Sequence, residues 1–249
     1  MMKKIIFITF WLLFILCSCV FAAEINIGVA ANFQQCINQI IAVYNIDKPI
    51  KINCVYGSSG KLFAQIKNGA PIDIYFSANS EYPRKLFVEN VTVSQPEVYA
   101  KGQLVLWSKD EKDLSNGLKS VLAADVDKIA IADPKVAPYG IESIAALKSA
   151  NIWEQIEDKI VYGSSIFQVN HFIVSKAVDM GITSLSSVIM LEEYRNQWIK
   201  IQDELYQPIE QAAVIINKGL VKQEVQDFYD FIFSDEAKVI IEKYGYKVE

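Results

Sequence analysis

The chain carries two identical pentapeptides, VYGSS, at positions 55–59 and 161–165. Each follows a short apolar run and precedes a segment whose apolar residues have helical spacing, so each marks a turn from a strand into a helix. The first N–H groups of a helix have no partner within it, and the helix dipole adds partial positive charge there. A Gly-Ser-Ser turn also lets an anion approach closely and adds hydroxyl donors. These residues therefore favour the binding of an oxyanion by neutral donors.

A single turn of this kind has a simpler explanation. Serine is a common residue at helix N-termini and glycine is common in tight turns, so capping alone accounts for one such turn. In a sheet of parallel strands, however, strand-to-helix junctions gather at the carboxyl ends of the strands, where they can surround one cleft. The chain has four junctions that look alike, at Ala31-Asn32, Ser58-Ser59, Tyr139-Gly140 and Ser164-Ser165-Ile166.

Signatures of catalytic or metal sites are missing from the sequence. The single histidine, His171, argues against a Ser-His-Asp hydrolase and against a zinc site. Lys61 stands where a GxSxG motif needs glycine, and Leu62 stands where a P-loop needs serine or threonine. Asp73 lies inside a predicted strand and Asp133 at the end of another, and we expect both carboxylates to bond the backbone of turns rather than to act as an acid or base. We therefore expect a binding protein and not an enzyme.

The elements that must position these junctions follow from the spacing of apolar residues. Apolar and β-branched runs predict strands at 24–30, 50–56, 72–77, 103–108, 128–132, 159–162 and 212–216. Helical spacing predicts helices between most of these strands and two closing helices over 224–233 and 235–244. We expect Asn32 to be the N-cap of the first helix. Alternating strands and helices are typical of the α/β class, with a mainly parallel sheet between layers of helices.

The first 22 residues differ in kind from the rest of the chain. Lys3 and Lys4 precede an almost wholly apolar stretch, and Val20-Phe21-Ala22 provides small residues for cleavage, which predicts a secretory signal peptide. Cleavage after Ala22 is preferred to lipid attachment at Cys19. The signal peptide holds two of the 24 basic residues and none of the 29 acidic ones, so its removal changes the net charge from −5 to −7. This charge argues against nucleic acids and anionic membranes as partners.

Two cysteines, Cys36 and Cys54, remain after the signal peptide is removed. The first falls on the apolar face of a predicted helix and the second in a predicted strand. We interpret them as two buried small hydrophobic residues. An exported protein can also oxidise such a pair, so a disulfide stays open as the alternative.

The stretch GSSGKLFAQIKNGAPIDIYFSAN at 57–79 resembles the central motif of the periplasmic molybdate-binding proteins, the solute receptors of ABC-type molybdate importers. The family pattern runs Ser-Ser-x-x-Leu, Gln-Ile, Gly-Ala-Pro-x-Asp and then a strand that ends in Ser-Ala-Asp/Asn. The likeness covers essentially the whole mature chain. Further matches are Ala30-Ala31-Asn32, Ala132-Asp133-Pro134, Pro138-Tyr139-Gly140 and Lys243-Tyr244-Gly245-Tyr246.

The resemblance implies a class II periplasmic-binding-protein fold, with two doubly wound α/β lobes and a ligand cleft between them. Lobe I is expected at 23–103 and again at 212–249, and lobe II at 104–211. The implied ligand is molybdate or tungstate. Sulfate or another oxyanion is the alternative within the class, and an enzyme built on the same two-lobe fold is the alternative outside it. The implied protein is a monomer in the periplasm that needs no cofactor and delivers its ligand to an ABC permease.

The resemblance also implies the ligand donors, carried over by motif position. Asn32 follows the first strand and Ser59 lies in the first Gly-Ser-Ser turn, while the backbone N–H groups of Tyr139 and Ile166 come from lobe II. Ser184 stands where many members have a tyrosine whose hydroxyl reaches the anion, and whether the shorter serine reaches it stays open. The hydroxyl of Tyr139 is a candidate to replace that tyrosine. No residue is expected to bind a metal directly.

Overall fold

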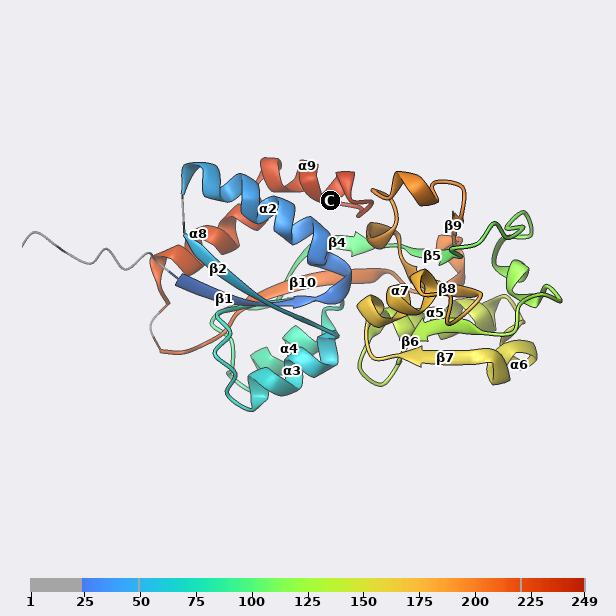
Figure 1. The fold of residues 1–249 in the computed structure, drawn as a ribbon. Helices are drawn as coiled ribbons and strands as arrows, with labels where there is room; N and C mark the ends of the chain where they lie inside the picture. Colours follow the sequence, from blue (N-terminus) through green and yellow to red (C-terminus); the bar gives the residue numbers. More distant parts are fainter. Residues whose placement is uncertain (1–23, 49, 220, 249) are drawn as a thin grey trace, which may run out of the picture.

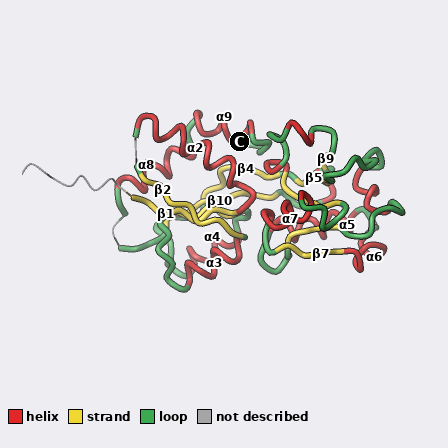
Figure 2. Tube along the Cα trace, viewed as in Figure 1, coloured by secondary structure: helices red, strands yellow, loops and turns green. Residues whose placement is uncertain are grey.

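The structure, a computed structural model, describes residues 24–48, 50–219 and 221–248. The predicted signal peptide and Cys19 lie outside these residues. The chain forms two lobes, each built on a five-stranded sheet, which confirms the predicted two-lobe α/β fold (Figure 1). Figure 2 shows the strands in the middle of each lobe and the helices around them. Within the described residues, no helix combines the length and the apolar character needed to cross a membrane.

Lobe I, on the left in Figure 1, contains the first four strands of the described chain and also the last strand, β10. Its strands lie in the order β2-β1-β3-β10-β4, in which β1, β2 and β3 run parallel and β10 runs antiparallel to both of its neighbours. The helices α2, α8 and α9 cover one face of this sheet, and α3 and α4 cover the other. The strands are β1 (Glu24–Ala30), β2 (Lys51–Gly57), β3 (Ile74–Ser77), β4 (Glu97–Gly102) and β10 (Ile209–Ile215), and the helices are α2 (Gln34–Asp47), α3 (Ser59–Lys67), α4 (Glu81–Val88), α8 (Gln223–Ile232) and α9 (Asp235–Lys243).

Alternation along the central strands of lobe I explains why it has two apolar cores. In β3, Ile74 and Phe76 belong to the core under α2, α8 and α9, while Tyr75 between them belongs to the core under α3 and α4. In β10, Ala213 faces the first core and Val214 the second. Successive side chains of a strand point to opposite faces of a sheet. The sheet is therefore buried on both faces, as in doubly wound folds.

Lobe II, on the right in Figure 1, is built on a sheet in the order β7-β6-β8-β5-β9. The strands β7, β6 and β8 run parallel, and β5 runs antiparallel to β8 and β9. Its strands are β5 (Leu104–Trp107), β6 (Ile129–Ala132), β7 (Ile160–Gly163), β8 (Met180–Ser184) and β9 (Trp198–Lys200), and its helices are α5 (Pro138–Ser149), α6 (Trp153–Ile156) and α7 (Ile166–Val174). Short 3-10 helices lie at Ala31–Phe33, Gly117–Leu122, Glu157–Lys159, Leu185–Ser187, Glu192–Tyr194 and Asp203–Leu205.

Two segments of the chain join the lobes. Gln103 links β4 to β5, and residues 201–208 link β9 to β10. The whole of β10, from Ile209, pairs within the lobe I sheet, so this strand begins ahead of the return expected at 212. Ala30 and Ala78 of lobe I pack into the apolar core of lobe II, so the two lobes are in contact. Any opening of the lobes must therefore turn about these two connections.

Cys36 and Cys54 are free and not joined by a disulfide. Cys36 is buried in α2, and burial raises the pKa of its thiol, as expected for a small hydrophobic residue in a core. Cys54 is only half-buried on β2.

Candidate functional site

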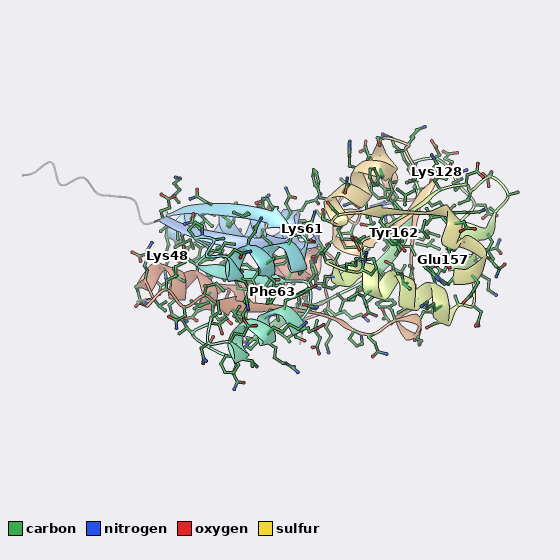
Figure 3. All side chains as sticks on the ribbon, turned by 90° about the horizontal axis from the view of Figure 1, so that it is seen from below. Lys48, Lys61, Phe63, Lys128, Glu157 and Tyr162 are labelled. Carbon is green, nitrogen blue, oxygen red and sulfur yellow. The ribbon has the colours of Figure 1, made fainter. Side chains whose placement is uncertain are left out.

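The four junctions predicted from the sequence meet at one cavity between the lobes. The cavity is lined by the end of β1 and the segments that follow β1, β2 and β3 in lobe I, and by the segments that follow β6 and β7 in lobe II. In Figure 3, Lys61 of lobe I and Tyr162 of lobe II lie on either side of the boundary at which the lobes meet. The cavity is lined by Ala30, Ala31, Asn32, Ser58, Ser59, Ala78, Ala137, Pro138, Tyr139 and Ile166.

The cavity is small and carries no charged side chain in its lining. The space open to the centre of a water molecule is about 10 Å³, whereas pockets for drug-sized molecules measure roughly 300–1,000 Å³. With the lobes in contact, the cavity therefore excludes sugars, peptides and nucleotides. Tyr139 is the ionisable residue of the lining, and burial raises the pKa of its hydroxyl well above the ordinary value. The charge of any anionic ligand must be met here by neutral donors.

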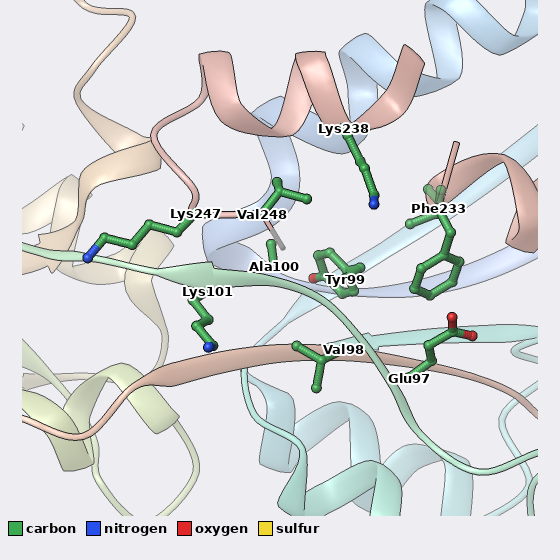
Figure 4. Close-up of a pocket in the computed structure, with 10 residues that line it drawn as sticks. Glu97, Val98, Tyr99, Ala100, Lys101, Phe233, Lys238, Lys247 and Val248 are labelled. Atoms are coloured by element: carbon green, nitrogen blue, oxygen red, sulfur yellow. The ribbon is translucent and has the colours of Figure 1, made fainter. Parts of the chain in front are cut away.

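A larger cavity, of about 340 Å³, lies between β4 and the C-terminal segment (Figure 4). Glu97, Lys101 and Lys247 are among its lining residues, and it shares none with the cavity between the lobes. Lys247, one of its lining residues, also forms an ion pair with Asp203, at 2.5 Å. Its lining includes the beginning of β4 and the end of α8 but no first residue of a helix, so size alone does not make it the functional site.

The two VYGSS copies differ in where the following helix begins. In lobe II, Ser165 caps α7 because its side chain accepts a hydrogen bond from the N–H of Gln168 at 3.4 Å, and Ile166 is the first helical residue. In lobe I, the corresponding serine, Ser59, is itself the first residue of α3. The cavity is lined by Ser59 from the first copy, but by Ile166, the residue after the motif, from the second.

Ser59 is held in place on both its backbone and its side chain. Its Oγ accepts a hydrogen bond from the N–H of Ala78 at 2.9 Å, and its carbonyl accepts one from the hydroxyl of Tyr75 at 2.7 Å. A serine oxygen that accepts from the backbone still has its own hydrogen to donate. Within the described residues, no acceptor lies in reach of that hydrogen. Ser59 therefore presents a fixed hydroxyl donor at the cavity.

Backbone N–H groups at the cavity also lack acceptors within the described part of the chain, among them those of Ser59, Tyr139 and Ile166. These three lie in the first turns of α3, α5 and α7, where a helix provides no internal acceptor. Pro138 precedes Tyr139 and fits the first helical position, which needs no N–H. Because α3 belongs to lobe I while α5 and α7 belong to lobe II, these donors approach the cavity from both sides.

Asn32 lines the cavity, but its side chain bonds other buried side chains, whereas a helix cap and a ligand donor were expected. It lies in a 3-10 helix and makes no capping bond, so its prediction as an N-cap is wrong. Its Nδ2 donates to Oε1 of Gln211 at 2.8 Å and to the hydroxyl of Tyr246 at 2.9 Å. Both amide hydrogens are used in these bonds. The arrangement therefore does not support the side-chain amide as a ligand donor and leaves the backbone N–H of Asn32 as the candidate.

The same buried network crosses between the lobes. Ser186 of lobe II donates from its Oγ to the carbonyl of Asn32 at 2.8 Å, and the hydroxyl of Tyr246 lies 3.1 Å from that Oγ. Sequence reasoning missed Ser186 and Gln211. Gln211 is a polar residue directly before the apolar residues of β10, and it is fully buried there. Its place beside that apolar run is the signal that could have revealed it.

Ser184 does not line the cavity with the other four predicted residues. It is fully buried, and its Oγ lies 2.7 Å from the Oγ of Ser187 and 3.0 Å from the Oγ of Ser186. The hydroxyl of Tyr139, the candidate to replace the family's tyrosine, lies against Gly102, where an added Cβ would be only 2.1 Å away, and its contact with a ligand stays a prediction. No hydrogen-bond partner for the Tyr139 hydroxyl exists within the described residues.

The remaining polar candidates have structural surroundings. Asp73 accepts from the backbone N–H of Asn26 at 2.7 Å, and Asp133 accepts from that of Lys135 at 3.0 Å, as expected for carboxylates that bond backbone. His171 is exposed on α7. In the part of the chain that the structure describes, no group of three or more acidic, histidine or cysteine side chains could hold a metal ion.

Comparison with known proteins shows similarity to solute-binding proteins along nearly the whole chain. The sequence pattern of the family described as "Bacterial extracellular solute-binding protein" matches residues 25–247. The molybdate-binding protein ModA of Rhodobacter capsulatus is 36% identical over 229 residues, which cover 92% of this chain and 90% of that protein. Among solved structures, the periplasmic molybdate-binding protein of Azotobacter vinelandii has a TM-score of 0.86 and 28% identity, and the match covers 91% of this chain and 100% of that one. The sulfate-binding protein SubI from Mycobacterium tuberculosis H37Rv, at 11% identity and a TM-score of 0.72 over 91% of this chain and 87% of its own, shows a common fold alone.

Proposed function

Because this chain belongs to the family of bacterial extracellular solute-binding proteins, we propose that it is the receptor of an ABC-type importer and that its solute is molybdate or tungstate. Its similarity over nearly the whole chain to proteins named for molybdate binding supports this ligand class. The observation that carries the proposal is the donor set at the cavity, which combines the hydroxyl of Ser59 with backbone N–H groups of Ser59, Tyr139 and Ile166.

A tetrahedral oxyanion matches this donor set because its fully deprotonated oxygens only accept hydrogen bonds. A hydrogen bond to a charged group contributes about 1.5–3 kcal/mol, and a helix N-terminus adds about 0.3–1 kcal/mol for an anion at its end. Several such donors hold a dianion without a basic side chain. A fixed set of donors in a small cavity also discriminates among anions by size, because an ion of another size cannot reach all of them.

The mechanism is capture by lobe closure. The anion enters the open cleft, loses water and accepts hydrogen bonds from Ser59 of lobe I and from Tyr139 and Ile166 of lobe II. Because these donors belong to different lobes, the bound anion stabilises the closed form over the open form. The closed receptor then docks on its membrane permease and delivers the anion there.

The proposal also covers the processing of the chain, its oligomeric state, its need for a cofactor and the bounds of its lobes. The mature receptor is a periplasmic monomer released by cleavage after Ala22, and lipid attachment at Cys19 is the alternative form. It uses no cofactor, since molybdenum enters as part of the solute. Lobe II extends from β5 to β9, and the chain returns to lobe I through residues 201–208.

Calorimetric titration of the mature protein with molybdate, tungstate, sulfate and phosphate tests the function. We expect tight one-to-one binding of molybdate and tungstate and much weaker binding of sulfate, because sulfate is smaller and cannot reach all of the donors at once. Preference for sulfate would instead make the protein a receptor for that anion. The absence of binding by all four anions would contradict the oxyanion site.

Affinity for the anion should be nearly independent of pH between about 6 and 9. Tyr139 is the ionisable residue of the lining, and burial raises its pKa well above 10, so its hydroxyl stays protonated throughout this range. Backbone N–H groups and the Ser59 hydroxyl do not titrate there. Calorimetry at several pH values checks this expectation. A fall in affinity of tenfold or more across the range would show that a titrating side chain takes part in binding.

A further inference from the structure

Gly60 makes a direct contact between the lobes at the edge of the cleft. It is the second residue of α3 in lobe I, and its N–H donates to the carbonyl of Val136 in lobe II at 2.8 Å. The neighbouring residue, Ser59, lines the cavity, and Val136 stands two residues before Pro138, which also lines it. This bond therefore joins the two walls of the cleft beside the ligand site, and it exists only while the lobes are in contact.

The contact is possible because residue 60 has no side chain. A Cβ at this position would lie 2.9 Å from the carbonyl oxygen of Val136 and 3.0 Å from its Cα, both of which are backbone atoms. It would also lie 2.7 Å from the hydroxyl of Tyr82, which is the far end of a side chain in the same lobe. The backbone of Gly60 is helical and not among the residues with positive φ, so an alanine can adopt it without strain.

Val136 cannot easily yield to an added methyl group. Its own N–H and that of Ala137 both donate to the carbonyl of Asp133, at 3.1 and 2.9 Å. The Asp133 side chain accepts from Lys135 at 3.0 Å and tightens the same loop. This loop leads directly into α5, which carries the Tyr139 N–H. A shift of Val136 away from lobe I would therefore also move a ligand donor.

We propose that Gly60 is the closure residue of this receptor: by allowing the two backbones to meet, it lets the lobes close fully and so positions the donors of lobe II on the anion held by lobe I. This inference rests on the proposed function, since closure is measured through the bound anion. The prediction is specific to the closed state. An alanine at position 60 is compatible with the open lobes but not with their full contact.

The test uses four variants of the mature protein: Gly60→Ala, Tyr82→Phe, the double variant and Lys61→Ala. Molybdate binding is measured by calorimetry, and compaction on adding molybdate is measured by small-angle X-ray scattering. We expect G60A to weaken molybdate binding by about tenfold or more, through the lost bond and the clash, and to compact less than wild type at saturating molybdate. The loss should persist when Tyr82→Phe removes the same-lobe hydroxyl. K61A, at the exposed next residue of the helix, should bind and compact like wild type.

Thermal unfolding of the ligand-free protein separates closure from a structural role. Alanine is the better helix former, so G60A should unfold no earlier than wild type when no ligand is present. Equal molybdate affinity of G60A and wild type, full rescue by Tyr82→Phe, or a lowered unfolding temperature of ligand-free G60A would each overturn the inference while leaving the function intact. A wild-type protein that fails to bind molybdate would remove the proposed function itself, and with it this inference.

Discussion

Replacing Ser59 with alanine should weaken molybdate binding by roughly 10- to 100-fold, the cost expected for one lost hydrogen bond to a charged ligand. The substitution removes the side-chain donor that lobe I presents at the cavity. It also leaves the N–H of Ala78 without its acceptor, since that group donates to the Ser59 Oγ at 2.9 Å. Calorimetric titration of S59A with molybdate checks the expectation, and the unfolding temperature of the ligand-free variant should fall by several degrees, because a buried N–H without an acceptor costs about 1–3 kcal/mol.

The matched control for S59A is Ser165→Ala, at the same position of the second VYGSS copy. Ser165 caps α7 through Gln168 and does not line the cavity. Loss of a cap costs about 1 kcal/mol of stability, so S165A should lower the unfolding temperature while it keeps most of the affinity for molybdate. If S165A lost as much affinity as S59A, the serines would act through their helices alone and not through a hydroxyl on the anion.

Replacing Gly140 with alanine should have the largest effect on stability among the substitutions considered for this protein. An added Cβ would lie 2.1 Å from the carbonyl oxygen of Ala132 and 2.9 Å from the backbone nitrogen of Pro134. Both are backbone atoms, one in the last residue of β6 and one in the loop that follows it, so α5 must move as a whole. Overpacking of this severity costs about 3 kcal/mol or more, which for a protein of this size lowers the unfolding temperature by roughly 6–12 °C.

Thermal unfolding of ligand-free G140A by circular dichroism measures this effect. The matched control is Gly57→Ala, at the strand-to-helix turn of lobe I, where an added Cβ would meet the Leu62 side chain at an ordinary 3.5 Å. We expect G57A to unfold close to the wild-type temperature. G140A should also bind molybdate more weakly, because the displaced helix carries the Tyr139 N–H. An unfolding temperature for G140A as high as that of G57A would contradict the close packing of α5 against β6.

The parts of the fold that could be predicted from the sequence are those that local patterns determine. The strand predicted at 24–30 agrees with β1, and those predicted at 50–56 and 159–162 agree with β2 and β7 within about a residue. Three strands were not predicted: β4 contains charged residues, β8 contains Gly181, and β9 is only three residues long. Their pairing in the sheet, and not their own propensity, determines these strands. The helix α4 was also missed, because Pro83 and its charges are typical of a loop.

In the candidate site, too, features set by neighbouring residues could be predicted, and contacts between residues far apart in the sequence could not. The turns that bring Ser59, Tyr139 and Ile166 to the cavity could be predicted because each depends on a few consecutive residues. The surroundings of Asn32 could not, because its partners Gln211 and Ser186 lie 179 and 154 residues away in the sequence. Local propensity favoured a helix cap at Asn32, but the buried network satisfied its amide instead. For the same reason, the position of Ser184 within a serine cluster was not visible from its motif.

The position of β10 has a consequence for the order in which this chain can fold. Lobe II is made from one continuous stretch, from β5 to β9, whereas the lobe I sheet needs β10 between β3 and β4. Until residues 209–215 have been synthesised, the sides of β3 and β4 that pair with β10 stay exposed and can pair with strands of other chains. Lobe II can therefore become native while lobe I still waits for the last part of the chain, and a product truncated before β10 would retain the Tyr139 and Ile166 wall of the cleft but have no completed sheet to hold Ser59 opposite it.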